Sequence, residues 1–328
     1  VVDDDLLMRV ANKAIVAPDA MVHTLAQIVK AAATLRGIAV PASVANVQVS
    51  EAAQRIATSL AEGKNVAVFL GNFAQHHAQA AQLHAHAQAL AEISGAKLGI
   101  LGEAANTVGA HVVRALPSSG KNARDMLAQP LKAYVLLGVE PELDAHDPAQ
   151  ALVAMKQAEL VVALSSFQHT AVDYAQVLLP IAPFTETAGT FVNTEGRAQS
   201  FQGVVQPLGE TRPAWKVLRV LGNLLGLAGF EHQSADDVRV EALGANGEKI
   251  NKNNTLNLTS VAPSASGGVQ RIAETPIYAA DALVRRAPSL QKTRDSEPPF
   301  ASMNRALAGK LGLREDRKST RLNSSHVA

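Results

Sequence analysis

The sequence predicts an α/β fold, built on a doubly wound and mostly parallel sheet with helical and irregular flanking segments. Three observations lead to this prediction. Short runs between residues 60 and 180 are apolar at successive positions, as in strands buried on both faces. Helical patterns separate these runs, and parallel strands need such crossover connections. The chain of 328 residues is 47% hydrophobic, which is enough for a sizeable core.

Two helices are expected before the first strand. An Ala-rich pattern over residues 18–35 predicts the first helix, with Asp19 placed to cap it. Residues 37–48 should form a loop, after which Ser50 caps a second helix that continues through Leu60.

Strands and helices then alternate along the chain. The expected strands are 65–70, 96–101, 132–138, 158–164 and 175–180. The expected helices are 74–94, 104–112, 121–128 and 148–157, with a short one before the last strand. A later helix should begin near Pro213 and end at Gly226 or Gly229, since proline suits a first turn and glycine a C-terminal stop.

Composition excludes several classes of function. The formal net charge is +1, so no field of the whole chain favours nucleic acid or an anionic membrane. The chain has no cysteine, which excludes disulfides, thiolate metal sites and cysteine-ligated iron–sulfur clusters within it. No uninterrupted apolar stretch approaches 18 residues, so no membrane-spanning helix is predicted.

The remaining local motifs are weak. In "HHAQAAQLHAH", His77 and His84 are seven apart with Ala80 midway, whereas zinc ligands on one helix are usually closer; a polar helix face is the simpler interpretation. Gly71 sits at a strand-to-helix turn, where phosphates can bind, but no dinucleotide or Walker motif surrounds it. The turn "GVEPE" (138–142) follows a strand, at the edge where open α/β sheets bind ligands.

The segment "PFTETAGTFVNTEGRAQSF" (183–201) has almost no regular hydrophobic period, so it is expected to be an irregular loop. Its glycines, Gly189 and Gly196, should supply positive φ or a close backbone approach. Arg197 could fork to Glu186 or Glu195, and ion pairing is the simpler role for these carboxylates than acid–base chemistry.

Asn193, in the same segment, could satisfy the amides of the loop. Two readings of the segment remain open, a structural one and a residual ligand site.

The spacing of these residues resembles the molybdopterin oxidoreductase superfamily. That family shows a G-x-N-P turn, an apolar strand, and then the pattern E-x-x-GT-x-x-N-x-EGR-x-Q. Here the turn is Gly138-Val139-Glu140-Pro141, and the second pattern is Glu186, Gly189-Thr190, Asn193, Glu195-Gly196-Arg197 and Gln199. A downstream P-x-GE-x-R-x-x-W pattern is similar to Pro207, Gly209-Glu210, Arg212 and Trp215.

Three further stretches, "ANKAIVAP", "APFTETAGTFVN" and "PIYAADALVRRAPSLQKT", are similar to the large iron–sulfur subunit of bacterial NADH:quinone oxidoreductase, respiratory complex I. This resemblance implies a structural part of the peripheral arm of a translocase that carries electrons from NADH to quinone. It implies partners among the other peripheral-arm subunits, neither nucleic acid nor direct membrane insertion, and a peripheral place on the cytoplasmic side of the inner membrane.

The resemblance also implies that the 4Fe-4S clusters of the full-length protein lie in an N-terminal region absent from this chain, which is expected to be a fragment. No catalytic residue, metal ligand or cofactor is then expected here. Cofactor-binding relatives usually carry Asn in place of Glu140 and Thr-Glu-Thr-Ala in place of residues 168–171, and both departures argue against a retained molybdopterin site.

The vestigial candidates for cofactor binding are Gly138, Glu140, Pro141, Glu186, Gly189, Thr190, Asn193, Glu195, Gly196 and Arg197. Two other functions stay open. The chain could be part of a true molybdopterin-dependent enzyme such as a formate dehydrogenase relative, or a free-standing nucleotide-binding module, against which the missing phosphate motifs count.

The predicted organisation has five parts. They are a helical lead-in that is the remainder of a truncated domain (1–59), a Rossmann-like α/β domain (60–180), a loop of family pattern plus helices (181–243), an irregular linker and start of a truncated C-terminal barrel domain (244–315), and a non-native, disordered tail (316–328).

Overall fold

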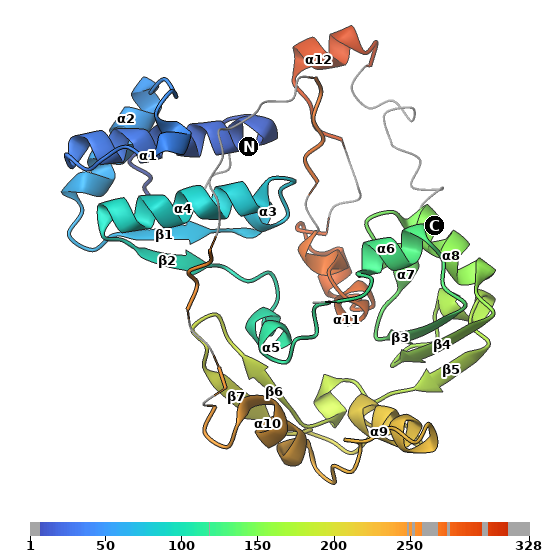
Figure 1. Cartoon of the computed structure of the whole chain (residues 1–328). Helices are drawn as coiled ribbons and strands as arrows, with labels where there is room; N and C mark the ends of the chain where they lie inside the picture. The colour runs from blue at the N-terminus through green and yellow to red at the C-terminus, as the bar shows by residue number, and fades with distance from the viewer. Residues whose placement is uncertain are drawn as a thin grey trace. The chain divides into compact units, whose positions relative to one another are not determined.

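The computed structural model describes residues 7–117, 119–247, 249–250, 253–257, 268–273, 276–296 and 301–313. The predicted tail, 316–328, lies outside the described residues. Contacts group the chain into two units. Unit 1 comprises Val1–Val113, Phe191–Gln199 and Leu243–Ala273, and unit 2 comprises Arg114–Thr190, Ser200–Ala242 and Glu274–Ala328. Both units contain parallel strands connected through helices, which confirms the α/β fold class (Figure 1).

The first 113 residues alternate helices with two strands. The elements are η1 (Pro18–Ala20), α1 (Met21–Leu35), η2 (Ala42–Val44), α2 (Glu51–Glu62), β1 (Ala67–Leu70), α3 (Asn72–Gln75), α4 (Ala80–Ser94), β2 (Lys97–Ile100) and α5 (Thr107–Val112). Strands β1 and β2 pair in parallel, with Ala67 opposite Lys97. Ser50 caps α2 as predicted, because its side chain accepts a hydrogen bond from the Ala53 amide.

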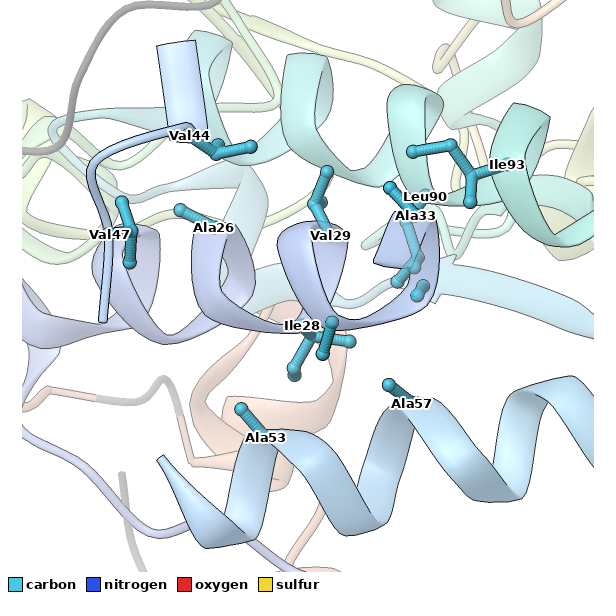
Figure 2. Packing of buried hydrophobic residues seen from close by; sticks show 12 residues of the cluster. Ala26, Ile28, Val29, Ala33, Val44, Val47, Ala53, Ala57, Leu90 and Ile93 are labelled. Carbon is cyan, nitrogen blue, oxygen red and sulfur yellow. The ribbon is translucent and has the colours of Figure 1, made fainter. Parts of the chain in front are cut away.

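The core of unit 1 lies where α1 packs against α2 and α4. Small side chains let these helices approach closely: Ala53 and Ala57 of α2 are fully buried. Figure 2 shows Ile28 of α1 pointing toward α2 at these two alanines. Leu90 and Ile93 of α4 belong to the same buried cluster. Burying this apolar surface is the main source of stability for such a helix layer.

Two local predictions in this unit are wrong. Asp19 caps no helix, because Pro18 starts the 3-10 turn η1 and α1 then begins after Ala20. The helix expected over 74–94 is interrupted after Gln75. His77 lies in this break: its Nδ1 accepts a hydrogen bond from the Gln79 amide at 2.9 Å, so it shares no helix face with His84.

From Arg114 onward, helices surround a second parallel sheet. The elements are α6 (Ala123–Ala128), β3 (Ala133–Leu137), α7 (Pro141–Asp144), α8 (Pro148–Gln157), β4 (Leu160–Ser165), η3 (Thr170–Asp173), β5 (Val177–Pro180), η4 (Phe184–Glu186), β6 (Gly189–Val192), β7 (Ala198–Phe201), α9 (Ala214–Leu224), α10 (Ala235–Leu243), η5 (Ile277–Ala279), α11 (Ala282–Arg285), η6 (Leu290–Lys292) and α12 (Arg305–Lys310).

The sheet of unit 2 has the order β3–β4–β5, all parallel, with Tyr134 opposite Val161. Its core includes Tyr134, Met155, Val161 and Tyr174. The Tyr134 hydroxyl donates to the Met126 carbonyl at 2.8 Å, so its polar tip is satisfied within the core. The predicted domain of residues 60–180 therefore includes strands of both units, because β1–β2 and β3–β4–β5 form separate sheets.

The segment predicted to be an irregular loop is instead partly regular, since β6 and β7 pair as a two-stranded sheet. Gly196 has φ +73° in the turn between them, as expected of that glycine. Gly189 makes the predicted close approach, because an added Cβ would lie 2.6 Å from the Phe201 ring. Four-residue strands are too short to produce a clear alternating pattern, which is why the sequence does not indicate them.

Candidate functional site

A tight turn at the carboxyl end of β3 holds the buried acidic residue Glu140. Gly138 takes φ +60°, which favours glycine, and its amide donates to the Leu164 carbonyl of β4 at 2.8 Å. Pro141 then starts α7, and the Glu140 amide donates to Asp144 Oδ2 at 2.7 Å. This turn lies at the edge of the sheet where open α/β folds bind ligands.

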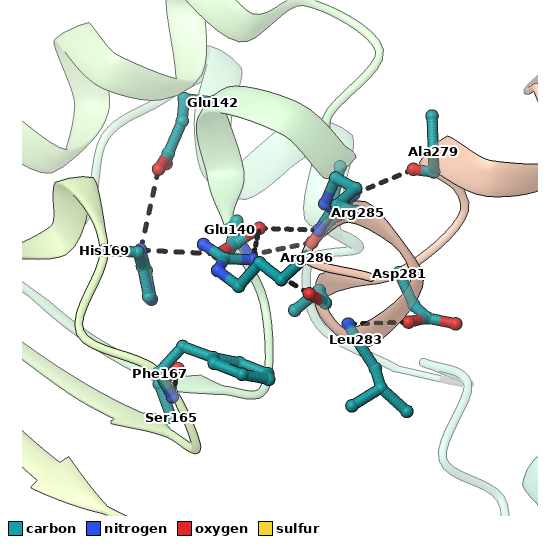
Figure 3. Close-up of polar contacts among 12 residues, drawn as sticks. Glu140, Glu142, Ser165, Phe167, His169, Ala279, Asp281, Leu283, Arg285 and Arg286 are labelled. Atoms are coloured by element: carbon teal, nitrogen blue, oxygen red, sulfur yellow. Dashed lines mark hydrogen bonds and ion pairs between the residues drawn. The ribbon is translucent and has the colours of Figure 1, made fainter. Parts of the chain in front are cut away.

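Two arginines from a distant segment occupy this edge. Arg285 Nη2 donates to Glu140 Oε2 at 2.8 Å, and Arg286 Nη1 donates to the same oxygen at 3.2 Å. Arg286 Nη2 also donates to Glu140 Oε1, which makes a two-pronged pair (Figure 3). Arg285 Nη1 contacts Asp144 Oδ1 at 2.9 Å. We call these four residues the clamp.

The clamp keeps its charges despite burial. The Glu140 side chain is only 2% exposed. Burial alone would raise the pKa of Glu140, but hydrogen bonds and charge from Arg286 and Arg285 outweigh it and hold this pKa below its ordinary value. Burial would likewise lower the pKa of Arg285, but Asp144 and Glu140 raise it instead. The buried carboxylate is therefore neutralised by partners rather than by a proton.

Further polar side chains lie next to the clamp. His169 Nδ1 is 3.7 Å from Glu140 Oε1 and from Glu142 Oε1, and it accepts a hydrogen bond from the Ala171 amide at 3.2 Å. The Tyr174 hydroxyl donates to Glu142 Oε2 at 3.0 Å. Burial first, and then the charge of Glu142, raise the pKa of Tyr174. Tyr174 is therefore a buried donor.

Aromatic contact completes the surroundings of the arginines. The guanidinium carbon of Arg286 lies 4.9 Å from the centre of the Phe167 ring, within the range of a cation–π contact. In the part of the chain that the structure describes, Glu142 Oε1 and His169 Nε2 are buried without a hydrogen-bond partner. The clamp and its neighbours thus bring several charged side chains together, and the fully buried carboxylate of Glu140 is shared by Arg285 and Arg286.

The structure divides the predicted site residues between the units. Gly138, Glu140, Pro141, Glu186, Gly189 and Thr190 belong to unit 2, whereas Asn193, Glu195, Gly196 and Arg197 belong to unit 1. Only the first three meet at the clamp. Thr190 Oγ1 lies 2.9 Å from Ser200 Oγ across β6 and β7, and no ligand role follows from that contact.

The turn between β6 and β7 is organised by Asn193, as predicted. Its Oδ1 accepts from the amides of Glu195 and Arg197 at 3.1 and 2.9 Å. The predicted ion pair of Arg197 is wrong: its side chain is exposed and pairs with no acid among the described residues. Glu186 has a different role, because its Oε2 accepts from the Leu208 amide at 2.9 Å. The side-chain oxygens of Asn193 and Glu186 therefore accept hydrogen bonds from backbone amides, and not from the guanidinium group that the sequence suggests.

Unit 2 also has a groove of about 600 Å³, which does not include the clamp. Its lining includes Glu186, Pro207, Arg212 and Trp215, which all carry the family-like spacing of the sequence. Lys216 Nζ lies 5.5 Å from the centre of the Trp215 ring. Residues with the family-like spacing thus lie together along one groove of unit 2.

Sequence reasoning missed the arginines of the clamp. Arg285 and Arg286 belong to a family-like stretch, but nothing near them in the sequence indicates their partner. The one available signal is complementary charge, between the paired cations "RR" and the acids of "GVEPELD". Charge alone does not identify a contact over such a sequence separation.

Neither a metal centre nor a membrane span is found in the described residues. No group of three or more His, Asp or Glu side chains there is placed to hold a metal ion. Within the same residues, none of the helices combines the length and apolar character needed to cross a lipid bilayer.

Comparison with known proteins identifies relatives. The family model described as "Molybdopterin oxidoreductase" matches residues 19–224, more than half of the chain. The "Probable oxidoreductase YjgC" of Bacillus subtilis (strain 168) is 34% identical over 112 residues, which are 34% of this chain and 11% of that protein. A "Putative formate dehydrogenase" of Staphylococcus aureus (strain USA300) is 35% identical over 82 residues, 25% of this chain and 8% of that protein. The match thus spans only 11% and 8% of these relatives.

Proposed function

Because the chain belongs to the molybdopterin oxidoreductase family, we propose that it is a structural part of an electron-transfer oxidoreductase, with no redox centre among its own residues. The subunit that we propose is the large iron–sulfur subunit of bacterial NADH:quinone oxidoreductase. In this proposal the chain supports the peripheral arm of the complex and takes no part in hydride transfer. The three sequence stretches similar to that subunit support it.

The clamp is the observation that carries the proposal. A phosphate-bearing pterin would have to settle at the carboxyl edge of β3 and β4, where ligands of such sheets bind. There the buried carboxylate of Glu140 is already paired with two arginines, and this ion-paired group fills the edge that the cofactor would need. The residues at this edge therefore do not fit the cofactor, and we derive no chemical step through it.

The wider assembly follows from the same proposal. Iron–sulfur clusters would be held by a cysteine-bearing region of the full-length protein, since this chain has no cysteine. The partners would be other subunits of the peripheral arm, on the cytoplasmic side of the bacterial inner membrane. Neither nucleic acid nor direct insertion into the membrane enters the proposal.

A second candidate is part of a formate dehydrogenase-like enzyme. The name of the Staphylococcus relative favours it, at 35% identity over 82 residues. In that case the vestigial candidate residues would lie near a bound pterin, and the clamp would have to open to admit it.

Metal analysis separates the two candidates. The chain, expressed in a host that makes pterin cofactors, should contain no stoichiometric molybdenum, tungsten or iron. About one molybdenum or tungsten per chain would overturn the structural role and favour the second candidate. A matched assay of the assembled complex, purified through a tag on the full-length protein, should show oxidation of NADH rather than of formate; formate oxidation would again contradict the first proposal.

A further inference from the structure

The segment that carries the two arginines is folded largely by its own contacts. We call residues 276–292 the strap. Asp281 caps α11 by accepting from the amides of Leu283 and Val284. The side-chain amide of Gln291 donates to the carbonyls of Tyr278 and Val284 at 2.9 and 2.8 Å. These bonds tie the two ends of the strap together without using any other part of unit 2.

The arginines stabilise the strap and also attach it. Arg285 Nη1 donates to the Ala279 carbonyl at 3.0 Å, and Arg286 Nη1 donates to the Ala282 carbonyl at 3.0 Å, so both side chains are held in place by the strap itself. Other N–H groups of the two guanidinium groups reach the carboxylates of Glu140 and Asp144, whereas Nε of Arg285 is buried without a hydrogen-bond partner among the described residues. In the described residues, all hydrogen bonds and ion pairs found between the strap and residues 114–190 or 200–242 of unit 2 pass through these two guanidinium groups.

The apolar side chains of the strap contribute little to its attachment. Ile277 is 64% exposed and Leu283 is 42% exposed. Among the described residues, the strap has no fully buried side chain. A segment with so little buried apolar surface depends on its polar contacts to remain in place.

The receiving surface is shaped for a guanidinium group. It offers a fully buried carboxylate, which suits the planar fork of arginine, and the face of Phe167 for stacking. It also offers a second carboxylate, Asp144, for the neighbouring arginine. A lysine ammonium group would make only part of these contacts, because it can neither bind a carboxylate through two parallel N–H groups nor stack on an aromatic ring as a planar group.

We propose that the carboxyl edge of β3 and β4 is a binding site for an arginine-bearing peptide segment, and that the chain occupies this site with its own strap. The strap acts as an intramolecular ligand that is already folded by its own hydrogen bonds. While it is docked, Glu140 is not accessible to other ligands. This inference deepens the proposed structural role, since a site filled by the chain has no space for a cofactor. Metal content tests the proposed function, and docking of the strap tests this inference. A chain that holds no metal and whose strap is not docked would overturn this inference and leave the proposed function standing.

Limited digestion with trypsin tests the docking in the full chain. Trypsin cleaves after arginine and lysine, so docking should protect the bonds after Arg285 and Arg286. We expect Glu140→Gln to increase cleavage there at least tenfold, with cleavage after the exposed Lys121 unchanged as an internal reference. The matched control is Glu159→Gln, which removes an exposed acid 3.3 Å from Lys132. Equal cleavage after Arg285 and Arg286 in the wild type and in Glu140→Gln would overturn the proposal.

A second measurement avoids changing the buried acid. In the full chain with Arg285→Gln and Arg286→Gln, the site is left empty of guanidinium groups. A fluorescein-labelled peptide of residues 276–293 should then bind in trans, at least tenfold more tightly than it binds the wild type, whose site is filled. The same peptide carrying lysines in place of both arginines should bind at least tenfold more weakly. Failure of the arginine peptide to bind the double variant, or equal binding of the lysine peptide, would overturn the proposal.

Discussion

Glu140 Oε2 lies 2.8 Å from Nη2 of Arg285, although 145 positions separate the two residues in the sequence. The same oxygen accepts a hydrogen bond from Arg286, so one carboxylate serves two cations. This contact joins the turn after β3 to the strap and decides what the sheet edge can bind. The stability of unit 2 should therefore depend on Glu140 far more than on its exposed acids.

Replacing Glu140 with Gln should destabilise unit 2 by about 3 kcal/mol, the lower end of the range for breaking a buried pair, because the arginines can turn partly toward water. Their side chains are already 13% and 30% exposed. The single tryptophan, Trp215, lies in unit 2, so its fluorescence during a urea titration reports this unit.

The control for this titration is Glu159→Gln, whose pair with Lys132 is exposed on both sides. It should shift the unfolding free energy by less than about 1 kcal/mol, as exposed ion pairs contribute little. If both variants unfold at the urea midpoint of the wild type, the clamp does not stabilise the unit.

The clamp should also give unit 2 a characteristic dependence on acid. Since the pKa of Glu140 is lowered in the folded state, its contribution to stability is present above the ordinary glutamate pKa and is lost as pH falls through the lowered value. Between pH 7 and pH 5 this contribution should stay constant.

The measurement is the difference in unfolding free energy between the wild type and Glu140→Gln, followed from pH 7 downward. The difference should shrink only below the ordinary pKa of a glutamate, about 4.3. A difference that already falls between pH 7 and pH 5 would mean that protonation of Glu140 does not control the clamp.

Much of the fold could be predicted because it is encoded locally. The cap of α2 at Ser50, the end of α9 before Gly226 and the bounds of α8 each depend on a few neighbouring residues, and all agree with the structure. The apolar runs locate β3, β4 and β5 for the same reason. Which strands pair depends on distant contacts, so the sequence did not separate the sheet of β1 and β2 from that of β3 to β5.

The candidate site was predictable only in part. The position of Glu140 after a strand indicated a sheet edge where ligands bind, which is where the structure has it. Its partners come from a segment with little regular structure, and ion pairing leaves no periodic pattern in a sequence. The ion pair expected for Arg197 is wrong because it was inferred from opposite charges that are close in the sequence. In the structure, backbone amides donate to Asn193 and Glu186, and Arg197 pairs with neither of the expected acids.

Gly138 should resist substitution because of its backbone and not because of crowding. It has φ +60°, and an added Cβ would meet nothing within 4 Å. Gly138→Ala should therefore cost about 1–2 kcal/mol, the penalty of a side chain in the left-handed region. Gly138→Asn should cost less, since asparagine visits that region more readily. Trp215 fluorescence in urea measures both, and an equal cost for the two variants would show that the left-handed backbone conformation does not determine the cost.

The turn between β6 and β7 offers a direct comparison of two family-like residues. Asn193→Ala removes the acceptor of the Glu195 and Arg197 amides. Losing such a side-chain cap costs about 0.5–2 kcal/mol, which should speed hydrogen exchange of these amides roughly 2- to 30-fold. Arg197→Ala should leave exchange at the Glu195 amide nearly unchanged, because its exposed side chain pairs with no acid in the described part of the chain. The reverse order of effects would show that Arg197 holds the turn, and its fixed place in the family-like pattern would then reflect a structural contact rather than an inherited ligand contact.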